Sequence, residues 1–469
     1  MNKYKTLLSN TLLISLGTFG SKLLVFLMVR FYTGYLTPTD YSTADLITQT
    51  ANLLFPIISM GLADGVFRFC MDSGADRKSV FSVGILSTTI GALLFFGIGP
   101  ALSLFGDFKG FVWLIVLYTM AAAYHSICSQ YIRAIGKTGL FALQGIIKTC
   151  FVIILNILFL AKFNLGIVGY VLSVIVADTL CTLFLIIKEK LWNVLTFKPD
   201  LSVIKPLFKY SIPLIPSTVF WWITSVSDRY MVSGMISSEV NGIYTVSYKL
   251  PTLLTLVSSI FMQAWQFSAV TESENGEEEH REFFSLVWRS FQAVMFLAGS
   301  MVIAFAKPAI KLLTAKEYYS AWQYVPLLSA SMVFTAFVSF TGTVYVVKKK
   351  SGVSFLTALL GASSNILLNL LLIPSPLGAQ GAAIATVSSY LIVFIVRCFN
   401  IKKYIPFKLY GIHVVLNSII LFIQSAVMIL EIKGWVIIES LCILSLLLLN
   451  FKFLIGFIKK ILSSVLKRG

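Results

Sequence analysis

Basic side chains within long apolar segments are the residues of this sequence that could bind a chemical group. Lys22, Lys148, Lys249 and Arg289 stand inside apolar stretches of about 20 residues, and Arg229 stands near the end of another. A charge in hydrocarbon is costly, and it marks either a functional site or a buried partner. Ammonium and guanidinium groups bind phosphate, so these residues predict an anion site. Structural pairing with a buried acid is the alternative that the sequence leaves open.

Lys249 is the strongest single candidate in this group. It lies about nine residues into its expected helix, roughly 13 Å from the nearer end. An ammonium group at that depth does not reach the membrane interface easily, so we expect it to face the interior of the protein. Lys148 and Lys22 lie at similar depth in their own segments.

Acidic residues are few within the apolar segments. Asp228 directly precedes Arg229 in the stretch WWITSVSDRYMVSG. Neighbouring residues stand about 100° apart around a helix, so the two side chains are not expected to face one partner. Asp64 and Arg68 are four residues apart and are expected to pair on one helix face. Asp178 stands alone within its segment.

Several arginines stand near the ends of apolar segments, namely Arg30, Arg68, Arg133 and Arg397. Long basic side chains at such places commonly extend to the lipid headgroups. Arg30 stands near the end of the first apolar segment as Arg229 stands near the end of the seventh. This correspondence makes a shared structural role at helix ends as credible as phosphate binding, and Arg30 and Arg68 stay among the candidates for substrate contact.

Other kinds of chemistry find little support. Six scattered cysteines form no C-x-x-C pair and the three histidines stand far apart, so no metal site or disulfide framework is predicted. The stretch GKTG resembles the end of a phosphate-binding loop, but the first glycine of that motif would fall at Tyr131. No paired carboxylates stand at an aqueous face. We therefore expect a protein that is not an enzyme and that holds no metal or organic cofactor.

The elements that must position these residues are membrane-spanning helices. Of 469 residues, 57% are hydrophobic and only 12% are charged, whereas about a quarter of a soluble chain is charged. The apolar segments predict an all-α integral membrane protein with about 14 transmembrane helices. They lie near residues 8–31, 44–67, 80–105, 111–132, 140–161, 166–187, 209–233, 240–266, 283–306, 322–347, 353–373, 378–399, 410–430 and 434–457.

The net charge of +17 follows from where the lysines and arginines stand. They fall mainly between alternate apolar segments, as the positive-inside rule describes for cytoplasmic loops. This pattern places both termini in the cytoplasm. Because membrane topology accounts for the charge, no nucleic-acid partner is expected.

Two bundles of six helices are expected within the chain. They comprise residues 1–190 and 207–403, joined by a cytoplasmic linker at 191–206, and residues 404–469 add two helices and a basic cytoplasmic tail. The stretches NILFLAKFNLGIVGY and NLLLIPSPLGAQGA resemble each other at an offset of about 212 residues, which predicts a parallel internal repeat. Pro206, Pro213 and Pro216 are expected to interrupt the seventh helix, and broken helices in repeat transporters often border the substrate site.

The sequence resembles the Wzx-type polysaccharide flippases, in the superfamily that also holds the MATE drug exporters and the lipid II flippase. The resemblance covers nearly the whole chain. It is sharpest in DRYMVSGMISSEVNGIYTVSYK, through Asp228-Arg229, Gly242-x-Tyr244 and Tyr248-Lys249, and the stretches PTDYSTADLI and GLADGVFRF add to it. Ser42 stands where that family usually has glycine.

The resemblance implies a fold of two pseudo-symmetric six-helix bundles in a V-shaped, MATE-like arrangement. It also implies a cargo, an oligosaccharide repeat unit on undecaprenyl pyrophosphate, moved by alternating access from the inner to the outer leaflet of the bacterial plasma membrane. Membrane lipids, a polysaccharide polymerase and glycosyltransferases are the implied partners. For such cargo the candidate contacts are Lys249, Arg229, Lys148, Lys22, Arg289, Arg30, Asp228 and Arg68.

Two alternatives stay open at this point. A MATE-like, cation-coupled exporter of organic cations would favour carboxylates over amines within the membrane, and here the amines dominate. A flippase for another lipid-linked glycan, such as lipid II, is closer in kind. Coupling to H+ or Na+ also stays open, because no clear acidic ion site is seen in the sequence.

Overall fold

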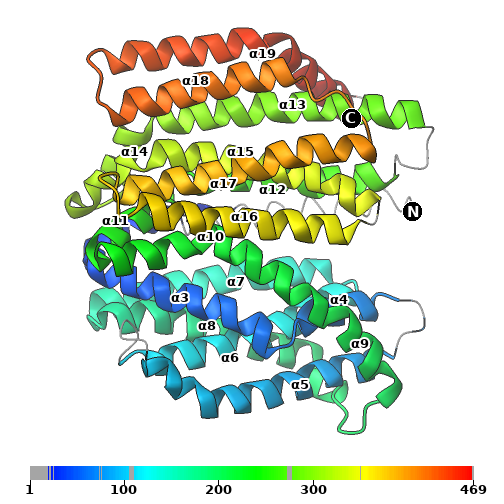
Figure 1. Cartoon of the computed structure of the whole chain (residues 1–469). Coiled ribbons are helices and arrows are strands. Elements are labelled where there is room, and N and C mark those ends of the chain that lie inside the picture. Colours follow the sequence, from blue (N-terminus) through cyan, green and yellow to red (C-terminus); the bar gives the residue numbers. More distant parts are fainter. Residues whose placement is uncertain are drawn as a thin grey trace. The chain divides into compact units, whose positions relative to one another are not determined.

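The computed structural model describes residues 20, 23–24, 26–72, 74, 76–104, 110–271, 277–348 and 350–466, and these residues form helices and connecting turns without any strand. Lys22 and most of the first expected span lie outside the described residues. The main helices are α2 (Val29–Tyr35), α3 (Pro38–Ile58), α4 (Leu62–Cys70), α5 (Arg77–Ile98), α6 (Val112–Ala134), α7 (Thr138–Asn156), α8 (Gly166–Glu189), α9 (Ile204–Ser211), α10 (Ile215–Met235), α11 (Ser238–Ser247), α12 (Thr252–Thr271), α13 (Glu277–Ala304), α14 (Ala306–Leu313), α15 (Val325–Val347), α16 (Ser351–Leu372), α17 (Ala379–Asn400), α18 (Gly411–Ile429) and α19 (Trp435–Leu466) (Figure 1).

Nine of the described helices are long and apolar enough to cross a membrane, or ten if the bent pair α3 and α4 is counted as one span. The expectation of an all-α, multi-pass membrane protein is therefore confirmed. The expected count of 14 spans is not established by the residues that the structure describes.

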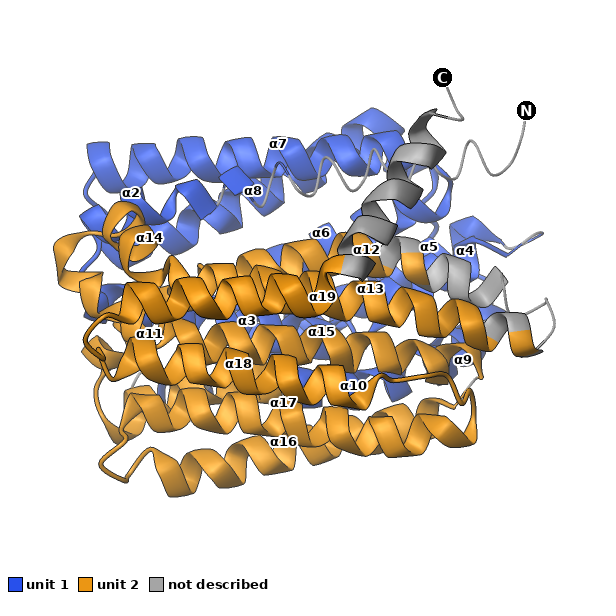
Figure 2. Cartoon of the chain, turned by 90° about the horizontal axis from the view of Figure 1, so that it is seen from above, with its two compact units in different colours: residues 1–222 blue, residues 223–469 orange. Residues whose placement is uncertain are grey.

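The chain divides into two compact units, residues 1–222 (unit 1) and residues 223–469 (unit 2), with the division inside α10 (Figure 2). In unit 1, α6 is the central helix, because α3, α4 and α8 all pack against it, and α7 covers α8. In unit 2, α15 packs against α12, α13, α17 and α18, while α16 lies on α17 and α19 lies on α13 and α18.

Interrupted helices occur in both units. In unit 1, α3 and α4 meet at a 53° bend, where Met60 and Gly61 have φ values of 51° and 66°. A side chain at Gly61 would lie 2.8 Å from the carbonyl oxygen of Ser211, so this glycine also permits a close approach to the end of α9. The expected interruption of the seventh span is confirmed, because α9, a short 3-10 turn at Ile212–Leu214 and α10 follow one another.

The helix that follows α10 is also broken, between α11 and α12. Pro251 stands at this break and has no N–H to donate to the carbonyl oxygen of Ser247, four residues before it. Ser237 begins α11 by accepting a hydrogen bond from the amide of Val240 at 3.2 Å. The result is a short helix whose last residues and the break after it lie close to the end of α10.

The two stretches that resemble each other in sequence also share local structure. Gly166 and Gly378 both precede or begin a long helix, and they have φ values of 51° and 53°. Asn156 and Asn369, which open the two stretches, are both fully buried. The internal repeat that the sequence predicts is thus visible in the backbone at corresponding positions.

Candidate functional site

A polar pocket of about 250 Å³ lies within unit 1. It is formed by α3, α6, α7 and α8, and its lining residues include Asn52, Tyr118, His125, Ser126, Ser129, Gln130, Lys148 and Asp178. Most of these side chains carry hydrogen-bonding groups, although each stands in a helix of spanning length. A pocket of this composition suits a polar ligand better than an apolar one.

Three charged or titratable groups meet in this pocket, one from each of three helices. The ammonium group of Lys148 on α7 forms an ion pair with Oδ1 of Asp178 on α8. The same oxygen lies 3.4 Å from Nδ1 of His125 on α6. The side chain of Asp178 is only 1% exposed, whereas that of Lys148 is 31% exposed. The acid is thus held in the interior, and the lysine also reaches the open part of the pocket.

Amide and hydroxyl groups fix the orientation of the histidine. Nε2 of His125 lies 2.9 Å from Oε1 of Gln144, and Nε2 of Gln144 donates to the hydroxyl of Ser129 at 3.1 Å. Oε1 of Gln130, another lining residue, is buried, and no described residue donates a hydrogen bond to it. The pocket therefore offers a cation and amide groups, a set that could bind both phosphate and sugar hydroxyls.

Sequence reasoning named Lys148 and Asp178 but missed the other members of this site. His125, Gln144 and Ser129 stand on α6 and α7, at separations of 4 to 19 residues that give no recognisable motif. One signal was present, because a histidine and a glutamine within apolar helices are themselves costly to bury. Only the packing of α6 against α7 and α8 brings these residues to Asp178.

Asp228 is another buried acid, and it belongs to unit 2. Its Oδ2 accepts hydrogen bonds from the hydroxyls of Tyr244 at 2.8 Å, Tyr248 at 2.5 Å and Thr386 at 3.2 Å. The side chain is fully buried. Asp228 therefore points into unit 2, where it joins α10 to α11, α17 and the first residue after α11.

Amides extend this network through the same unit. Nδ2 of Asn365 lies 3.4 Å from the hydroxyl of Thr386, and Oδ1 of Asn365 accepts hydrogen bonds from Ser227 and Asn369. These residues belong to α10, α16 and α17. A carboxylate that receives this many donors holds these helices of unit 2 in register.

The contacts of Arg229 contradict the expectation that Asp228 and Arg229 face different partners. The guanidinium carbon of Arg229 lies 4.7 Å from the centre of the Tyr248 ring, while the hydroxyl of the same tyrosine donates to Asp228. The expectation that the two charges do not share a partner was wrong. A tyrosine offers a ring face and a hydroxyl on different sides, and the long arginine side chain bridges the angle around the helix.

Lys249 does not stand deep within a continuous helix, as the sequence had suggested. It lies in the break between α11 and α12, directly after Tyr248, and it is partly exposed. Pro251 ends the regular hydrogen bonding two residues later. Lys249 is thus the chain neighbour of Tyr248, the residue whose ring Arg229 contacts.

Arg289 lies elsewhere in unit 2, against the start of α18. Its guanidinium carbon is 4.2 Å from the centre of the Tyr410 ring, and Nη2 is 3.3 Å from Nε2 of His413. These contacts support a packing role between α13 and α18.

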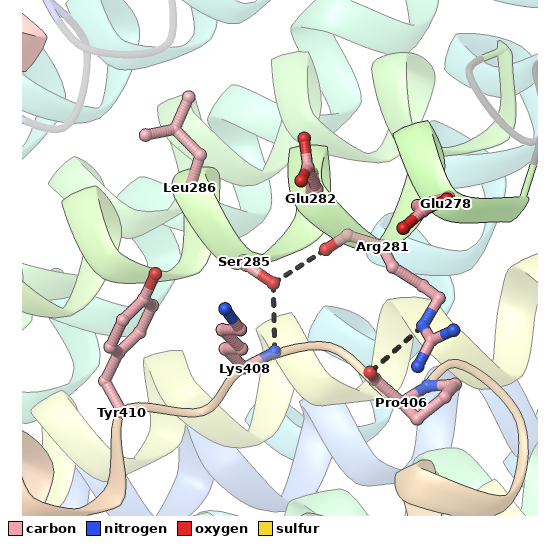
Figure 3. A pocket seen from close by; sticks show the side chains of 8 residues that line it. All are labelled: Glu278, Arg281, Glu282, Ser285, Leu286, Pro406, Lys408 and Tyr410. Carbon is pink, nitrogen blue, oxygen red and sulfur yellow. Dashed lines mark hydrogen bonds between the residues drawn. The ribbon is translucent and has the colours of Figure 1, made fainter.

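A second pocket of about 390 Å³ lies next to this contact (Figure 3). Its lining residues are Glu278, Arg281, Glu282, Ser285, Leu286, Pro406, Lys408 and Tyr410. Arg281 donates to the carbonyl oxygen of Pro406 at 3.3 Å, and the amide of Lys408 donates to Ser285 at 2.9 Å. These bonds fasten the segment before α18 to α13. The two glutamates offset the positive charges of Arg281 and Lys408, so this pocket is less suited to an anion than the unit 1 pocket is.

The remaining candidates are not gathered at either pocket. Arg68 forms an ion pair with Asp72, so the expected pairing with Asp64 was wrong; both partners are 53% exposed, beyond the apolar part of α4. Arg30 is exposed on α2, whereas its sequence counterpart Arg229 is partly buried.

Arg397 differs most from expectation, because it does not extend to a headgroup region. It is 2% exposed, its Nη1 donates to the carbonyl oxygen of Val338 at 2.6 Å, and its Nη2 donates to the hydroxyl of Thr357 at 2.7 Å. A side chain on Gly342 would lie 2.6 Å from Nη1. The glycine thus makes room for the arginine among α15, α16 and α17.

We expect Arg397→Ala to lower the free energy of unfolding by about 2 kcal/mol, since a large buried side chain is lost and its space cannot close fully. Thermal unfolding of the detergent-solubilised protein measures this change. Arg133→Ala is the matched control, because Arg133 also stands in the last turn of its helix but is exposed. An equal loss of stability in the two variants would contradict the structural role of Arg397.

Comparison with known proteins supports this description of the fold. The family described as polysaccharide biosynthesis protein matches residues 7–267, more than half of the chain. Among solved structures, the lipid II flippase MurJ in an inward closed conformation is similar with a TM-score of 0.70 and 17% identity, covering 96% of this chain and 100% of that one. No curated protein sequence matches the chain significantly.

Transporters of the MATE family have a similar fold. An inward-facing multidrug resistance MATE transporter of the MOP superfamily matches with a TM-score of 0.67 and 14% identity, over 82% of this chain and 95% of that one. An outward-facing structure of such a transporter matches with a TM-score of 0.61, over 84% of this chain and 95% of that one. At these identities the likeness concerns the fold, and it confirms the MATE-like architecture.

Proposed function

Because the chain belongs to the polysaccharide biosynthesis protein family and has a MATE-like fold, we propose that it is a flippase that moves an oligosaccharide repeat unit linked to undecaprenyl pyrophosphate across the bacterial plasma membrane. The movement runs from the inner to the outer leaflet and serves the synthesis of a surface polysaccharide. The two six-helix bundles carry the alternating access, and both termini lie in the cytoplasm, where the basic loops gather.

The observation that carries this proposal is the unit 1 pocket with its partly exposed Lys148. The cargo needs a cation for its pyrophosphate and polar groups for its sugars, while its lipid tail can stay in the bilayer. Lys148 supplies the cation, and Gln130, Ser129 and Asn52 supply polar groups around it. In unit 2, Arg229, whose guanidinium group lies over the ring of Tyr248, and the partly exposed Lys249 are further candidate cations for an anionic cargo.

The membrane potential assists this direction of transport. An inside-negative potential favours outward movement of an anion by about 2.3 kcal/mol per charge for each 100 mV. A pyrophosphate diester carries two charges, so its translocation gains roughly twice that amount. A cation exporter would work against the same field.

The drug-exporter alternative is disfavoured by the state of the acids. An organic cation needs an accessible carboxylate, but Asp178 is already paired with Lys148, and Asp228 is buried among the hydroxyls of Tyr244, Tyr248 and Thr386. Within the described residues, the unit 1 pocket therefore favours an anionic headgroup over an organic cation.

Deletion of the gene, followed by analysis of membrane lipids, tests the proposal. We expect a lipid-linked oligosaccharide repeat unit to accumulate in the inner leaflet and the surface polysaccharide to disappear, with both restored by the wild-type gene on a plasmid. Accumulation of the peptidoglycan precursor would assign the protein to lipid II instead. An unchanged glycan together with increased sensitivity to cationic drugs would contradict the proposal and favour the exporter.

A further inference from the structure

The hydrogen bonds around His125 define which of its nitrogens carries a proton in the neutral ring. The amide nitrogen of Gln144 donates to Ser129, so the amide oxygen of Gln144 faces Nε2 of His125 at 2.9 Å. A carbonyl oxygen only accepts, and Nε2 must therefore be the donor. In a neutral imidazole, Nδ1 is then an acceptor. That acceptor lies 3.4 Å from Oδ1 of Asp178.

Two acceptors at this separation repel each other unless a proton lies between them. Protonation of Nδ1 converts the contact into a charged hydrogen bond from His125 to Asp178. Oδ1 of Asp178 is also the atom that pairs with the ammonium group of Lys148. His125 and Lys148 therefore compete for one oxygen, and the charge state of the histidine determines how strongly the lysine is held.

We propose that His125 is a proton-binding site that controls the availability of Lys148 to the anionic headgroup. With neutral His125, Lys148 and Asp178 neutralise each other. With protonated His125, the histidine neutralises Asp178, the pocket gains one positive charge, and Lys148 can turn to a pyrophosphate. The proton comes from water and returns to it, and no bond of the cargo changes. This inference rests on the proposed function.

The surroundings of His125 contain few other groups that could produce such a response. The charged groups that act on its ring are Lys148 from α7 and Asp178 from α8. Tyr118 of α6 lines the same pocket, and the thiol of Cys181 on α8 lies 3.8 Å from the backbone oxygen of Gln144.

The remaining helices that pack against α6 add no titratable group to the described lining of this pocket. From α3 the lining side chains are Asn52 and Phe55, and α4 and α5 contribute none. Tyrosine and cysteine ordinarily titrate above the range of histidine, so within the described lining His125 is the residue type whose ordinary range lies closest to neutral pH.

The coupling between proton binding at His125 and anion binding in the pocket has a defined sign. A proton on His125 favours anion binding, and by linkage a bound anion favours the proton by the same factor. Affinity for the headgroup must therefore rise as pH falls. If the affinity instead decreases as the pH is lowered, the proposal is overturned, whatever the behaviour of the variants.

The experiment measures binding of citronellyl pyrophosphoryl-N-acetylglucosamine to the purified full-length protein in detergent, between about pH 5.5 and 8.5, the range in which histidine titrates. This short-chain pyrophosphate diester keeps its own charge throughout that range. We expect the affinity of the wild type to increase by at least about fivefold toward the acidic end. His125→Gln should bind with an affinity that no longer depends on pH.

Asp178→Asn provides a second, independent variant, because it removes the competitor for Lys148 without changing shape. We expect it to bind at high pH about as tightly as the wild type binds at low pH. His413→Gln is the matched control, since this histidine lies in unit 2 against Arg289 and should leave the pH response intact. A pH response that persists in His125→Gln would also overturn the proposal.

The double variant Lys148→Gln/Asp178→Asn separates failure of this inference from failure of the proposed function, because it removes the lysine without leaving a buried carboxylate unpaired. If the double variant binds the probe as the wild type does, the pocket is not the headgroup site and both proposals fail there. If the double variant loses binding while His125→Gln keeps the pH response, the headgroup site stands and the proton site is refuted.

Discussion

The double variant Lys148→Gln/Asp178→Asn is expected to bind the pyrophosphate headgroup about 10- to 100-fold more weakly than the wild type, because one charged hydrogen bond contributes about 1.5–3 kcal/mol. The amount of surface polysaccharide on cells that carry the double variant should decrease in parallel. The two replacements remove one charge of each sign, so the interior of unit 1 keeps its electrical balance. The loss then reports on the anion and not on misfolding.

The double variant is preferable to Lys148→Ala for a physical reason. Removing the lysine alone would leave Asp178, which is 1% exposed, as a buried carboxylate without its ion-pair partner. Breaking a buried pair in this way costs about 3–5 kcal/mol of stability. Membrane content of the double variant, measured by immunoblot against the wild type, shows whether the protein is retained.

Unit 1 contains a matched control for this experiment. Lys137 and Glu189 form an ion pair that also joins the α7 and α8 segments, but the side chain of Lys137 is 50% exposed. The pair lies outside the pocket lining. Lys137→Gln/Glu189→Gln should therefore leave export and binding near wild-type levels. Normal surface glycan in Lys148→Gln/Asp178→Asn would remove Lys148 from the site.

Asp228→Ala is expected to lower the free energy of unfolding of the protein by about 3–5 kcal/mol, the cost of breaking a buried charged contact. The variant deprives the hydroxyls of Tyr244, Tyr248 and Thr386 of their common acceptor. All three side chains are buried, so water cannot easily replace the carboxylate. Thermal unfolding in detergent should show the loss as a lower midpoint temperature.

Single donor replacements test whether the stabilisation is shared. Tyr248→Phe and Thr386→Val each remove one hydrogen bond, and each should cost about 1 kcal/mol. Asp200→Ala is the control, because Asp200 also accepts a hydrogen bond, from the amide of Ser202, but is exposed. It should stay within about 0.5 kcal/mol of the wild type. A midpoint for Asp228→Ala equal to that of the control would contradict the role of Asp228.

The sequence predicts a structural feature well when the residues that cause the feature stand in the same segment of the chain. The apolar segments indicated the long helices, the prolines around 206–216 indicated the interruption before α10, and the Leu-Gly pairs indicated the repeat. Pro251 is also such a residue, because it stands at the break between α11 and α12 in which Lys249 lies. In these cases the responsible residue stands next to the structure that it produces.

Partners distant in sequence could not be predicted in the same way. The pairing of Lys148 with Asp178 depends on the register of α7 against α8, which no spacing reveals. Arg397 stands at a helix end in the sequence, yet Gly342 on α15 opens a buried space for it. Arg68 had acids on both sides within reach and pairs with Asp72. Each outcome depends on tertiary packing.

The glycines of the repeat show that chirality can constrain a sequence independently of size. Gly166 has no neighbouring atom within 4 Å of the position that a β-carbon would occupy, and Gly378 has only the tip of Ile236, at 3.8 Å. Space would thus allow a methyl group at both positions. Their positive φ values nevertheless penalise an L-residue, whereas a D-alanine would meet no such penalty. The requirement for glycine at these turns therefore comes from backbone handedness, and additional space around them would not make L-alanine acceptable.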